Sequence, residues 1–474
     1  MQILKKWILS SLLCVSFTYE IYASNNSPPT VITEIPPSGI VIDSPGTYIF
    51  GNNITWSPVS NGQAILILSK DVILDLKSYT LASETTSFNT TGIVAGLSEN
   101  LTIKNGTIAN MAFRGIDCEA CSNILIKHIT IDGLNIENTA VYTVPVGILV
   151  SASKAAIVYK CTVKNINVKT GSCAAIQMTG TTQSLIQNCI VSNLLNRDGA
   201  CTGIGHLLCN IASVKSCTLN RLESQFIDNL NTQGHTAIGL IPFISTNLRI
   251  MDCNVSNVIG CCDDAHGISI FECTNAIVKN CKVTNVSDGA GPAQTGAKAT
   301  GIEVYGSDIH VIKCSVKNIS AINPQDKQAT GFSCAQGSRI SFIKCHAEHV
   351  QVFDQNGNQS PSLGYGTGFG WAPDPRIIEP AIDVLYKHCS AKYCQVGFDS
   401  WFHIDSVWSN IYSKCNGINI LNLGDSAQRT VSCDACSECG CTFTGCYPAP
   451  FVITIDNIAK NNTFSKVKIK NCEH

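Results

Sequence analysis

A small residue followed by an apolar one recurs along most of this chain, and this repeat constrains the fold more than any other feature. Successive copies are 23 to 37 residues apart. A period of this size is typical of solenoids, in which each repeat is one structural unit that packs against the next. The copies are Gly92-Ile93, Gly115-Ile116, Gly147-Ile148, Ala175-Ile176, Gly203-Ile204, Ala237-Ile238, Gly267-Ile268, Gly301-Ile302, Gly331-Phe332, Gly368-Phe369 and Gly397-Phe398.

Each of these pairs of a small and an apolar residue is here called a step. Two further short runs follow each step, and both alternate between apolar and polar residues. The last run has the pattern Cys-x-Val-x-Asn, which is complete in Cys161-Val163-Asn165, Cys189-Val191-Asn193, Cys253-Val255-Asn257, Cys281-Val283-Asn285 and Cys314-Val316-Asn318. Because the apolar spacing is two and not 3.6, we predict three strands per repeat and no helices. Stacked at about 4.8 Å per coil, these strands form parallel sheets around one core. The prediction is an all-β solenoid of about eleven coils, roughly 50 Å long.

The repeat and the segment that precedes it resemble a known superfamily. That segment is Ser44-Pro45-Gly46-Thr47-Tyr48-Ile49, and Val72-Ile73-Leu74-Asp75-Leu76 follows it. Over roughly residues 30 to 420 the chain is similar to right-handed parallel β-helices of the pectin-lyase type. The resemblance implies that fold. It implies no single activity, because the superfamily contains hydrolases, lyases, epimerases, adhesins and phage tail proteins.

The two ends of the chain depart from the repeat. Lys5 and Lys6 precede the apolar stretch 7–17, which has the length of a signal-peptide core and is too short to span a bilayer. We therefore expect a signal peptide over residues 1–23, a protein that is secreted or held at the cell surface, and no transmembrane segment. Residues 24–60 and the cysteine-rich residues 422–474 are expected to cap a β-helix over 61–421, because an uncovered solenoid end exposes strand edges.

Charge and composition argue against some partners. Charged residues make up 14% of the chain and its formal net charge is -2, whereas roughly 25% of residues are charged in an average globular protein. The polar surface must therefore be carried mainly by Asn, Ser, Thr and Gly. Because no stripe of Lys or Arg is visible along the sequence, we expect neither nucleic acid nor an anionic membrane surface as a partner.

The Cys-x-Val-x-Asn pattern has a structural explanation at each position. Asparagine tolerates a left-handed backbone and its amide can bond the next coil, which predicts a ladder of Asn110, Asn165, Asn193, Asn257, Asn285 and Asn318. Stacked Cβ atoms about 4.8 Å apart exceed the usual span of a disulfide, so we expect free thiols that point into the core. These cysteines are Cys161, Cys189, Cys217, Cys253, Cys281, Cys314, Cys345, Cys389 and Cys415.

Other cysteines lie outside that ladder: Cys118, Cys121, Cys261, Cys262 and the dense run Cys433, Cys436, Cys439, Cys441 and Cys446. In an exported protein the dense run favours disulfides, with free thiols as the alternative. Zinc prefers two separated ligand pairs with a fold between them, so we expect no metal and no cofactor.

Candidate chemistry lies on neighbouring coils. When the coils are aligned on the repeated step, the residues just before it stack: Asp198 on one coil, His235 on the next, Asp263, Asp264 and His266 on the following one, and Lys298 after that. In an enzyme, Asp263 and Asp264 would supply acid and base, or His235 would remove a ring proton while Lys298 stabilises a sugar carboxylate. Glu303 follows Ile302 and is expected to point outward as an exposed partner carboxylate. The alternative is a polar turn in which His235 bonds an aspartate.

The resemblance to polygalacturonases of this fold is partial. Those enzymes carry Asn-Thr-Asp, Asp-Asp, Gly-His-Gly and Arg-Ile-Lys on successive coils. This chain instead has Asn231-Thr232-Gln233, then Asp263-Asp264 with His266 on the same coil, then Arg339-Ile340-Ser341. A standard polygalacturonase mechanism is therefore not expected. Pectate-lyase chemistry needs an acidic calcium site, for which Asp263 and Asp264 are only partial candidates.

One more histidine needs separate treatment. His206 occupies an inward position that Met178, Val304 and Cys334 hold on other coils. We expect it to be a core histidine whose hydrogen-bonding groups are satisfied.

Two functions stay open at this point. The first is a non-catalytic exported β-helix that binds glycans or proteins through its sheet faces. The second is a hydrolase, lyase or epimerase that acts on uronate-type polysaccharides through His235, Asp263, Asp264, Lys298 and Glu303. Convergence of these residues on an open groove favours the enzyme, and a hydrogen-bonded turn favours the binding protein.

Overall fold

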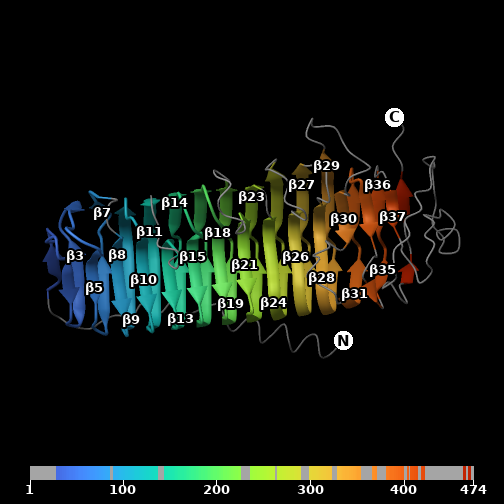
Figure 1. Cartoon of the computed structure of the whole chain (residues 1–474). Coiled ribbons are helices and arrows are strands. Elements are labelled where there is room, and N and C mark those ends of the chain that lie inside the picture. The colour runs from blue at the N-terminus through green and yellow to red at the C-terminus, as the bar shows by residue number, and fades with distance from the viewer. Residues whose placement is uncertain are drawn as a thin grey trace, which may run out of the picture.

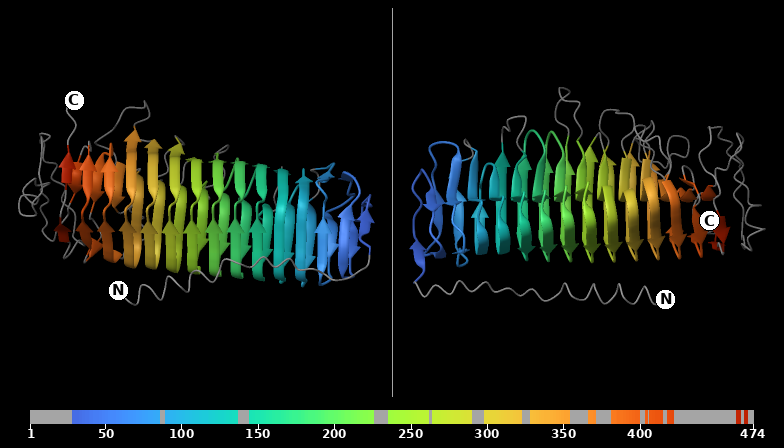
Figure 2. Two further views of the ribbon diagram at one scale, coloured as in Figure 1. Left: turned by 180° about the vertical axis from the view of Figure 1, so that it is seen from behind. Right: turned by 90° about the horizontal axis from the view of Figure 1, so that it is seen from below.

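The chain folds as a stack of short parallel strands along one axis (Figure 1). In this computed structural model the strands follow one another from blue to red along the stack, and Figure 2 shows the same order from behind and from below. No helix occurs among the residues that the structure describes, as the period-2 pattern predicts. These residues are 28–85, 89–136, 144–225, 235–261, 264–289, 298–322, 328–353, 366–370, 381–399, 403–404, 406–414, 418–421, 463–465 and 468–470.

Strand pairing defines three sheet faces, here called sheets A, B and C, which each complete coil visits in that order. Sheet A holds β2 (Ile40–Ile42), β5 (Gly62–Ile67), β8 (Thr90–Gly96), β10 (Arg114–Glu119), β12 (Val146–Ser151), β15 (Cys173–Thr179), β18 (Cys201–Leu207), β21 (Ala237–Phe243), the first halves of β24 (Ala265–Lys279), β26 (Lys298–Ile312) and β28 (Gln328–Ile343), and β30 (Gly366–Gly370), β33 (Val396–Asp399) and β37 (Ile418–Leu421).

Sheet B continues each coil. It holds β1 (Thr30–Ile32), β3 (Gly46–Phe50), β6 (Val72–Asp75), the first halves of β9 (Glu99–Ala109) and β11 (Ser122–Ile136), β13 (Lys154–Tyr159), β16 (Thr182–Gln187), β19 (Asn210–Lys215), β22 (Thr246–Met251), the second halves of β24, β26 and β28, and β31 (Ala381–Lys387), β34 (His403–Ile404), β35 (Val407–Ser409) and β38 (Thr463–Ser465).

Sheet C closes each coil. It holds β4 (Ile54–Trp56), β7 (Thr80–Ser83), the second halves of β9 and β11, β14 (Thr162–Val168), β17 (Ile190–Asn196), β20 (Thr218–Ser224), β23 (Asn254–Cys261), β25 (Lys282–Gly289), β27 (Ser315–Ile322), β29 (His346–Phe353), β32 (Ser390–Lys392), β36 (Tyr412–Lys414) and β39 (Lys468–Lys470). Already at the start of the described chain, β1 to β4 pair in parallel with the coils that follow them.

One column of apolar side chains runs through sheet A and forms part of the core. The paired residues are Ile65, Ile93, Ile116, Ile148, Ile176, Ile204, Leu240, Ile268, Ile302, Phe332, Phe369 and Phe398. Each of them is at most 1% exposed. The predicted stack of repeat isoleucines is therefore confirmed except at Ile238, which is half-buried and pairs with His266.

Glycine explains why Leu240 replaces Ile238 in that column. A Cβ atom at Gly239 would lie 2.4 Å from the carbonyl oxygen of Gly267 on the next coil and 2.4 Å from Cγ1 of Val255. A Cβ atom at Gly203 on the previous coil would likewise lie 2.5 Å from the carbonyl oxygen of Gly239. The strand pairing agrees with this close fit, because Leu240 pairs with Ile204 on one side and with Ile268 on the other. The coils therefore align on Gly239-Leu240, and the alignment on Ala237-Ile238 is wrong by two residues.

The cysteines of the repeat point into the core. The described members from Cys161 to Cys389 are buried, and no described cysteine is in a disulfide. Cys189 shows the common pattern: its Sγ contacts the carbonyl oxygens of Gln187 at 3.4 Å and of Val158 on the preceding coil at 3.6 Å. The prediction of buried free thiols is confirmed for these residues. Cys262, Cys415 and the dense run 433–446 lie outside the described residues.

The asparagine ladder is confirmed in sheet C. Every predicted member has a left-handed backbone, with φ between 55° and 58°. Asn318 donates from Nδ2 to Oδ1 of Asn285 at 2.9 Å, and Asn285 donates to Asn257 in the same way at 2.9 Å. Arg221 takes the left-handed position on one coil, and there Asn220 accepts the amide of Asn257 at 2.7 Å.

No helix in the described part of the chain is long and apolar enough to cross a membrane.

Candidate functional site

An ionic cluster lies on sheet A at the N-terminal ends of strands β24 and β26. Oδ1 of Asp264 accepts a hydrogen bond from the backbone nitrogen of Lys298 on the next coil at 3.1 Å. Nζ of Lys298 donates to Oε1 of Glu303 at 2.7 Å. Three of the predicted site residues therefore meet in one place. Asp263, which was predicted to act with Asp264 as acid and base, lies outside the described residues.

The ring of His266 lies between the two carboxylates of this cluster. Its Nε2 is 3.5 Å from Oδ2 of Asp264, and its Nδ1 is 3.3 Å from Oε2 of Glu303. Ser269 also donates to Oε2 of Glu303, at 3.0 Å. His266, Lys298 and Glu303 are only 4%, 6% and 4% exposed. These three members are thus largely closed off from solvent, whereas Asp264 is half-buried with 16% of its side chain exposed.

Both carboxylates of the cluster are held in the ionised form. Burial on its own raises the pKa of Asp264, but the hydrogen bond with His266 and the charge of Lys298 outweigh burial and hold the pKa below its usual value. Burial likewise opposes ionisation of Glu303, and the charges of Lys298 and His266 again lower its pKa. Neither group is therefore protonated at neutral pH, as a general acid would have to be.

His235 contacts another partner. Its Nε2 is 3.7 Å from Oδ1 of Asp198 on the preceding coil, and the residue is 2% exposed. The sequence alignment set Ala237 opposite Gly267. In the structure Ala237 pairs with Ala265, so His235 lies two residues away from its predicted register. This contact with Asp198 agrees with the polar-turn alternative.

The structure differs from the sequence predictions in the exposure of Glu303 and in the hydrogen bonding of His206. Glu303 follows the inward Ile302 and points away from the core as expected, yet it is not exposed, because Lys298, Ser269 and His266 surround its carboxylate. His206 is paired with Met178 and is buried as expected. Its Nε2, however, has no hydrogen-bond partner, so it is not fully satisfied. Among the described residues, no three His, Cys, Asp or Glu side chains are placed to hold a metal ion.

An open groove lies at the corner between sheets A and B, and the sequence analysis missed it. Phe243, Phe271 and Tyr305 follow one another on successive coils there and are half-buried. The rings of Phe243 and Phe271 stack with centroids 5.3 Å apart, and Tyr305 meets Phe271 edge to face at 4.7 Å. Beside Tyr305 is a groove of about 370 Å³ whose other lining side chains include Glu272, Thr274, Ser307, Gln336, Ser338 and Ile382.

The sequence contains a signal for this aromatic row. Each aromatic residue stands three positions after the core residue of its coil, as Phe271 does after Ile268 and Tyr305 after Ile302. On the coil before, Phe243 stands three positions after Leu240. The alignment on Ile238 hid that regularity, because it placed Phe243 at a different offset.

Comparison with known proteins adds a family match and distant structural neighbours. Residues 78–240 match the family described as "Right handed beta helix region". No curated protein matches. The catalytic domain of a GH87 alpha-1,3-glucanase in complex with nigerose is 12% identical with a TM-score of 0.29, and the match covers 74% of this chain and 60% of that one. This chain thus spans 60% of the length of the glucanase domain.

Two further solved structures are similar to this chain at the same low level. An exopolygalacturonase from Thermotoga maritima is 11% identical with a TM-score of 0.36, over 65% of this chain and 83% of that one. A mutant tailspike protein of E. coli bacteriophage HK620 in complex with a pentasaccharide is 12% identical with a TM-score of 0.41, over 80% of this chain and 69% of that one. These likenesses are too distant to inform activity. By its strand pairing and by the match over residues 78–240, the chain folds as a right-handed parallel β-helix.

Proposed function

We propose that this protein is an exported, non-catalytic β-helix that binds a glycan in the groove beside Tyr305. The observation that carries the proposal is the pairing of an aromatic row with an open polar groove. An aromatic ring offers a flat apolar surface to the C–H face of a sugar, while nearby hydroxyl, amide and carboxylate groups bond sugar hydroxyls. Lys5 and Lys6 before the apolar stretch 7–17 support export.

The ionic cluster supports binding rather than turnover. Hydrolysis of a glycoside needs one protonated carboxyl and one ionised carboxyl on either side of the scissile bond. Here Asp264 and Glu303 are both held ionised and both contact His266. Glu303 and Tyr305 are two residues apart on β26, so the cluster borders the aromatic row and stabilises the strands that carry it.

The groove also has a charge preference. Glu272 is exposed and lines it, and none of the described side chains that line it is Lys, Arg or His. A negative charge at the edge repels anionic sugars. The proposed ligand of the groove is therefore a neutral glycan.

The test is retention on a panel of neutral and acidic polysaccharides by affinity electrophoresis. Tyr305→Ala should weaken retention by about tenfold, since loss of an aromatic anchor costs on the order of 1 to 2 kcal/mol, and Tyr305→Phe should retain most of it. Tyr159→Ala, at a half-buried outward tyrosine of β13, is the matched control and should change nothing. Equal retention of the wild type and Tyr305→Ala on every glycan would refute the proposal.

A further inference from the structure

A row of lysines lies at the corner between sheets B and C, on the C-terminal half of the stack. At this corner each coil carries an inward cysteine, and the residues on either side of it face outward. Around Cys281, Cys314, Cys345 and Cys389 many of these outward residues are lysines. We call the following set the lysine ridge: Lys279, Lys282, Lys313, Lys317, Lys344, Lys387, Lys392 and Lys414.

Stacking brings these lysines together on successive coils. The backbone nitrogen of Lys344 donates to the carbonyl oxygen of Lys387 at 2.8 Å, and that of Lys313 donates to Ile343 at 2.8 Å. In sheet C, Lys317 pairs with Glu348, Glu348 with Lys392, and Lys392 with Lys414. Neighbouring coils are about 4.8 Å apart. The ridge is thus a line of cations along the rod.

The positive charge of the ridge is largely unneutralised. Lys317 forms an ion pair with Glu348 at 3.3 Å. None of the other ridge lysines forms an ion pair with any carboxylate in the described part of the chain. Five of them, Lys279, Lys282, Lys313, Lys344 and Lys387, are exposed. Like charges in a row repel one another, so the fold gains no stability from them.

The repeat does not require lysine at this corner. Around Cys189 the corresponding outward residues are Gln187, Asn188, Ile190 and Ser192, none of which is charged. That coil has the same sheets and the same buried cysteine. The lysines are therefore not part of the repeat, and they are denser on the C-terminal coils, although Lys160, Lys164 and Lys215 occupy the same corner on earlier coils. The sequence shows no stripe because Lys313, Lys344 and Lys387 are 31 and 43 residues apart along the chain.

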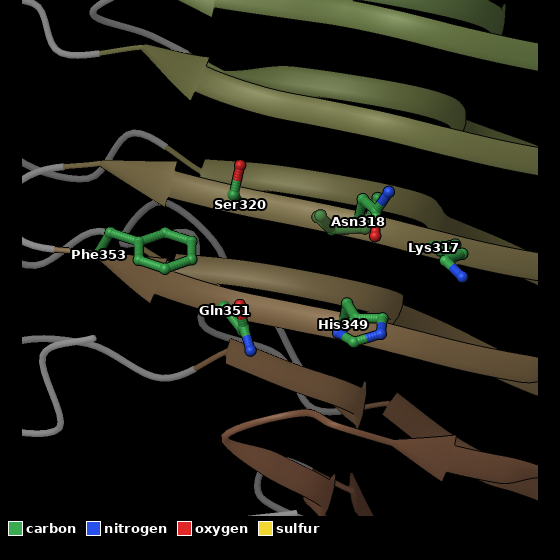
Figure 3. Close-up of a pocket in the computed structure, with 7 residues that line it drawn as sticks. Lys317, Asn318, Ser320, His349, Gln351 and Phe353 are labelled. Atoms are coloured by element: carbon green, nitrogen blue, oxygen red, sulfur yellow. The ribbon is translucent and has the colours of Figure 1, made fainter. Parts of the chain in front are cut away.

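A pocket opens beside the ridge on the outer face of sheet C. It has a volume of about 280 Å³ and lies between β27 and β29. Figure 3 shows its side chains on these two neighbouring strands, with Lys317 and His349 near one end and Phe353 at the other. Asn318, Ser320 and Gln351 supply amide and hydroxyl groups between them. A cation, hydrogen-bonding side chains and an aromatic ring thus line one hollow.

We propose that the lysine ridge and this pocket form a second binding site, which takes a linear polysaccharide with a carboxylate or sulfate on its sugar residues. A chain laid along the rod would meet one or two cations on each coil. The pocket would hold one sugar ring against Phe353, and the unpaired lysines of the ridge would face the acidic groups, because Lys317 and His349 both contact Glu348. This site lies at a different corner from the groove beside Tyr305 and does not depend on it.

The ridge is better suited to an acidic glycan than to a nucleic acid. Its charges are all lysines, which act as hydrated point charges, whereas bidentate recognition of phosphate favours arginine. Single-stranded nucleic acids also need a series of aromatic side chains on which bases stack. At this corner, among the described residues, the exposed rings beside the lysines are those of His388 and of Tyr393, which stacks on His349, and they do not form a continuous series.

The experiment measures binding of the full chain to four polymers at low and high salt: dextran sulfate, polygalacturonate, neutral dextran and single-stranded DNA. The proposal expects binding to dextran sulfate, polygalacturonate or both, no binding to neutral dextran through the ridge, and weakening by salt. The first two polymers distinguish sulfate from carboxylate as the preferred group. DNA bound as tightly as the better acidic glycan, or no binding to either acidic glycan, would overturn the proposal.

Matched variants locate the binding. Lys313→Gln, Lys344→Gln and Lys387→Gln together should lower affinity for the acidic glycan at least about tenfold and reduce its salt dependence. Lys70→Gln, Lys154→Gln and Lys169→Gln remove the same charge at exposed sites elsewhere and should change affinity less than about twofold. An equal loss in both triple variants would show nonspecific attraction and overturn the proposal. Tyr305→Ala should leave binding of the acidic glycan intact, which separates this site from the groove.

Discussion

Lys298 and Glu303 form a buried ion pair, with Nζ 2.7 Å from Oε1 and both side chains less than 10% exposed. His266 and Ser269 complete the environment of the carboxylate. A buried pair of this kind is costly to break, because the remaining charge loses its partner and has no water to replace it. The pair lies within β26, and the contacts of Glu303 with His266 and Ser269 join this strand to β24 beside the aromatic row.

Removal of one partner should destabilise the protein strongly. Lys298→Met leaves Glu303 buried without its ammonium, and we expect the free energy of unfolding to fall by about 3 to 5 kcal/mol. Denaturant unfolding monitored by circular dichroism measures the change. Lys317→Met breaks the exposed pair with Glu348 and should cost less than about 1 kcal/mol. Equal effects of the two changes would contradict the structural role of the cluster.

The core histidine should make the protein sensitive to mild acid. Burial lowers the pKa of His206 to about 4, whereas an unfolded histidine titrates near 6.5. The unfolded chain therefore takes up the proton first as pH falls. The contribution of neutral His206 to the free energy of unfolding is present above about pH 6.5 and is lost as pH falls toward 4. The loss is on the order of 3 kcal/mol.

A variant isolates that effect. His206→Met introduces the residue that stands at the paired position of the preceding coil, Met178. It should abolish most of the dependence of stability on pH between 6.5 and 4. His128→Asn, at an exposed histidine with a left-handed backbone, is the control and should keep the wild-type dependence. Melting curves recorded at half-unit pH steps would show the difference, and identical curves for His206→Met and wild type would rule it out.

The ladder thiols should resist labelling in the native protein. Cys189, Cys217, Cys253 and Cys281 are buried in the core, so a labelling reagent reaches them only when the coils open. Of the described cysteines only Cys261 is half-exposed, so peptide mapping after brief alkylation should find it modified first. Cys217→Ala should cost about 1 kcal/mol. Rapid native labelling of the ladder would contradict the packing.

Two substitutions at Asn285 should separate the contributions of backbone strain and of hydrogen bonding to stability. Asn285 has a φ of 56° and bonds Asn257 and Asn318. Asn285→Gly removes both side-chain bonds but suits the left-handed backbone, while Asn285→Ala adds the cost of placing a Cβ there. We expect Ala to be less stable than Gly by about 1 kcal/mol. Chemical denaturation of both variants tests this, and an Ala variant as stable as the Gly variant would contradict it.

The sequence predicted the solenoid well because its period depends on local features. The repeated small residue, the inward cysteine and the left-handed asparagine each belong to one coil, so the pattern of a single repeat defines them. Register was harder, since Ala237-Ile238 and Gly239-Leu240 both fit the repeated pair, and the pairing of Leu240 with Ile204 and Ile268 selects the second.

The sites were harder to predict because they depend on contacts between coils. Asp264, Lys298 and Glu303 were found as neighbours, but their burial depends on how His266 and Ser269 pack around the carboxylates. The lysine ridge was missed because its members are spread over more than a hundred residues, each beside a different cysteine. Alignment of the coils on the cysteines instead of the glycines reveals it.

The most direct test of the account asks whether a bound glycan is released intact. The wild-type protein is incubated with each polysaccharide that it retains, and the products are assayed for new reducing ends and for unsaturated ends. We predict that Tyr305→Ala weakens binding of neutral glycans and that the wild type forms no new ends of either kind even after long incubation. Formation of new ends by the wild type, and its loss in Glu303→Gln with the fold intact, would contradict the account and identify the cluster as catalytic.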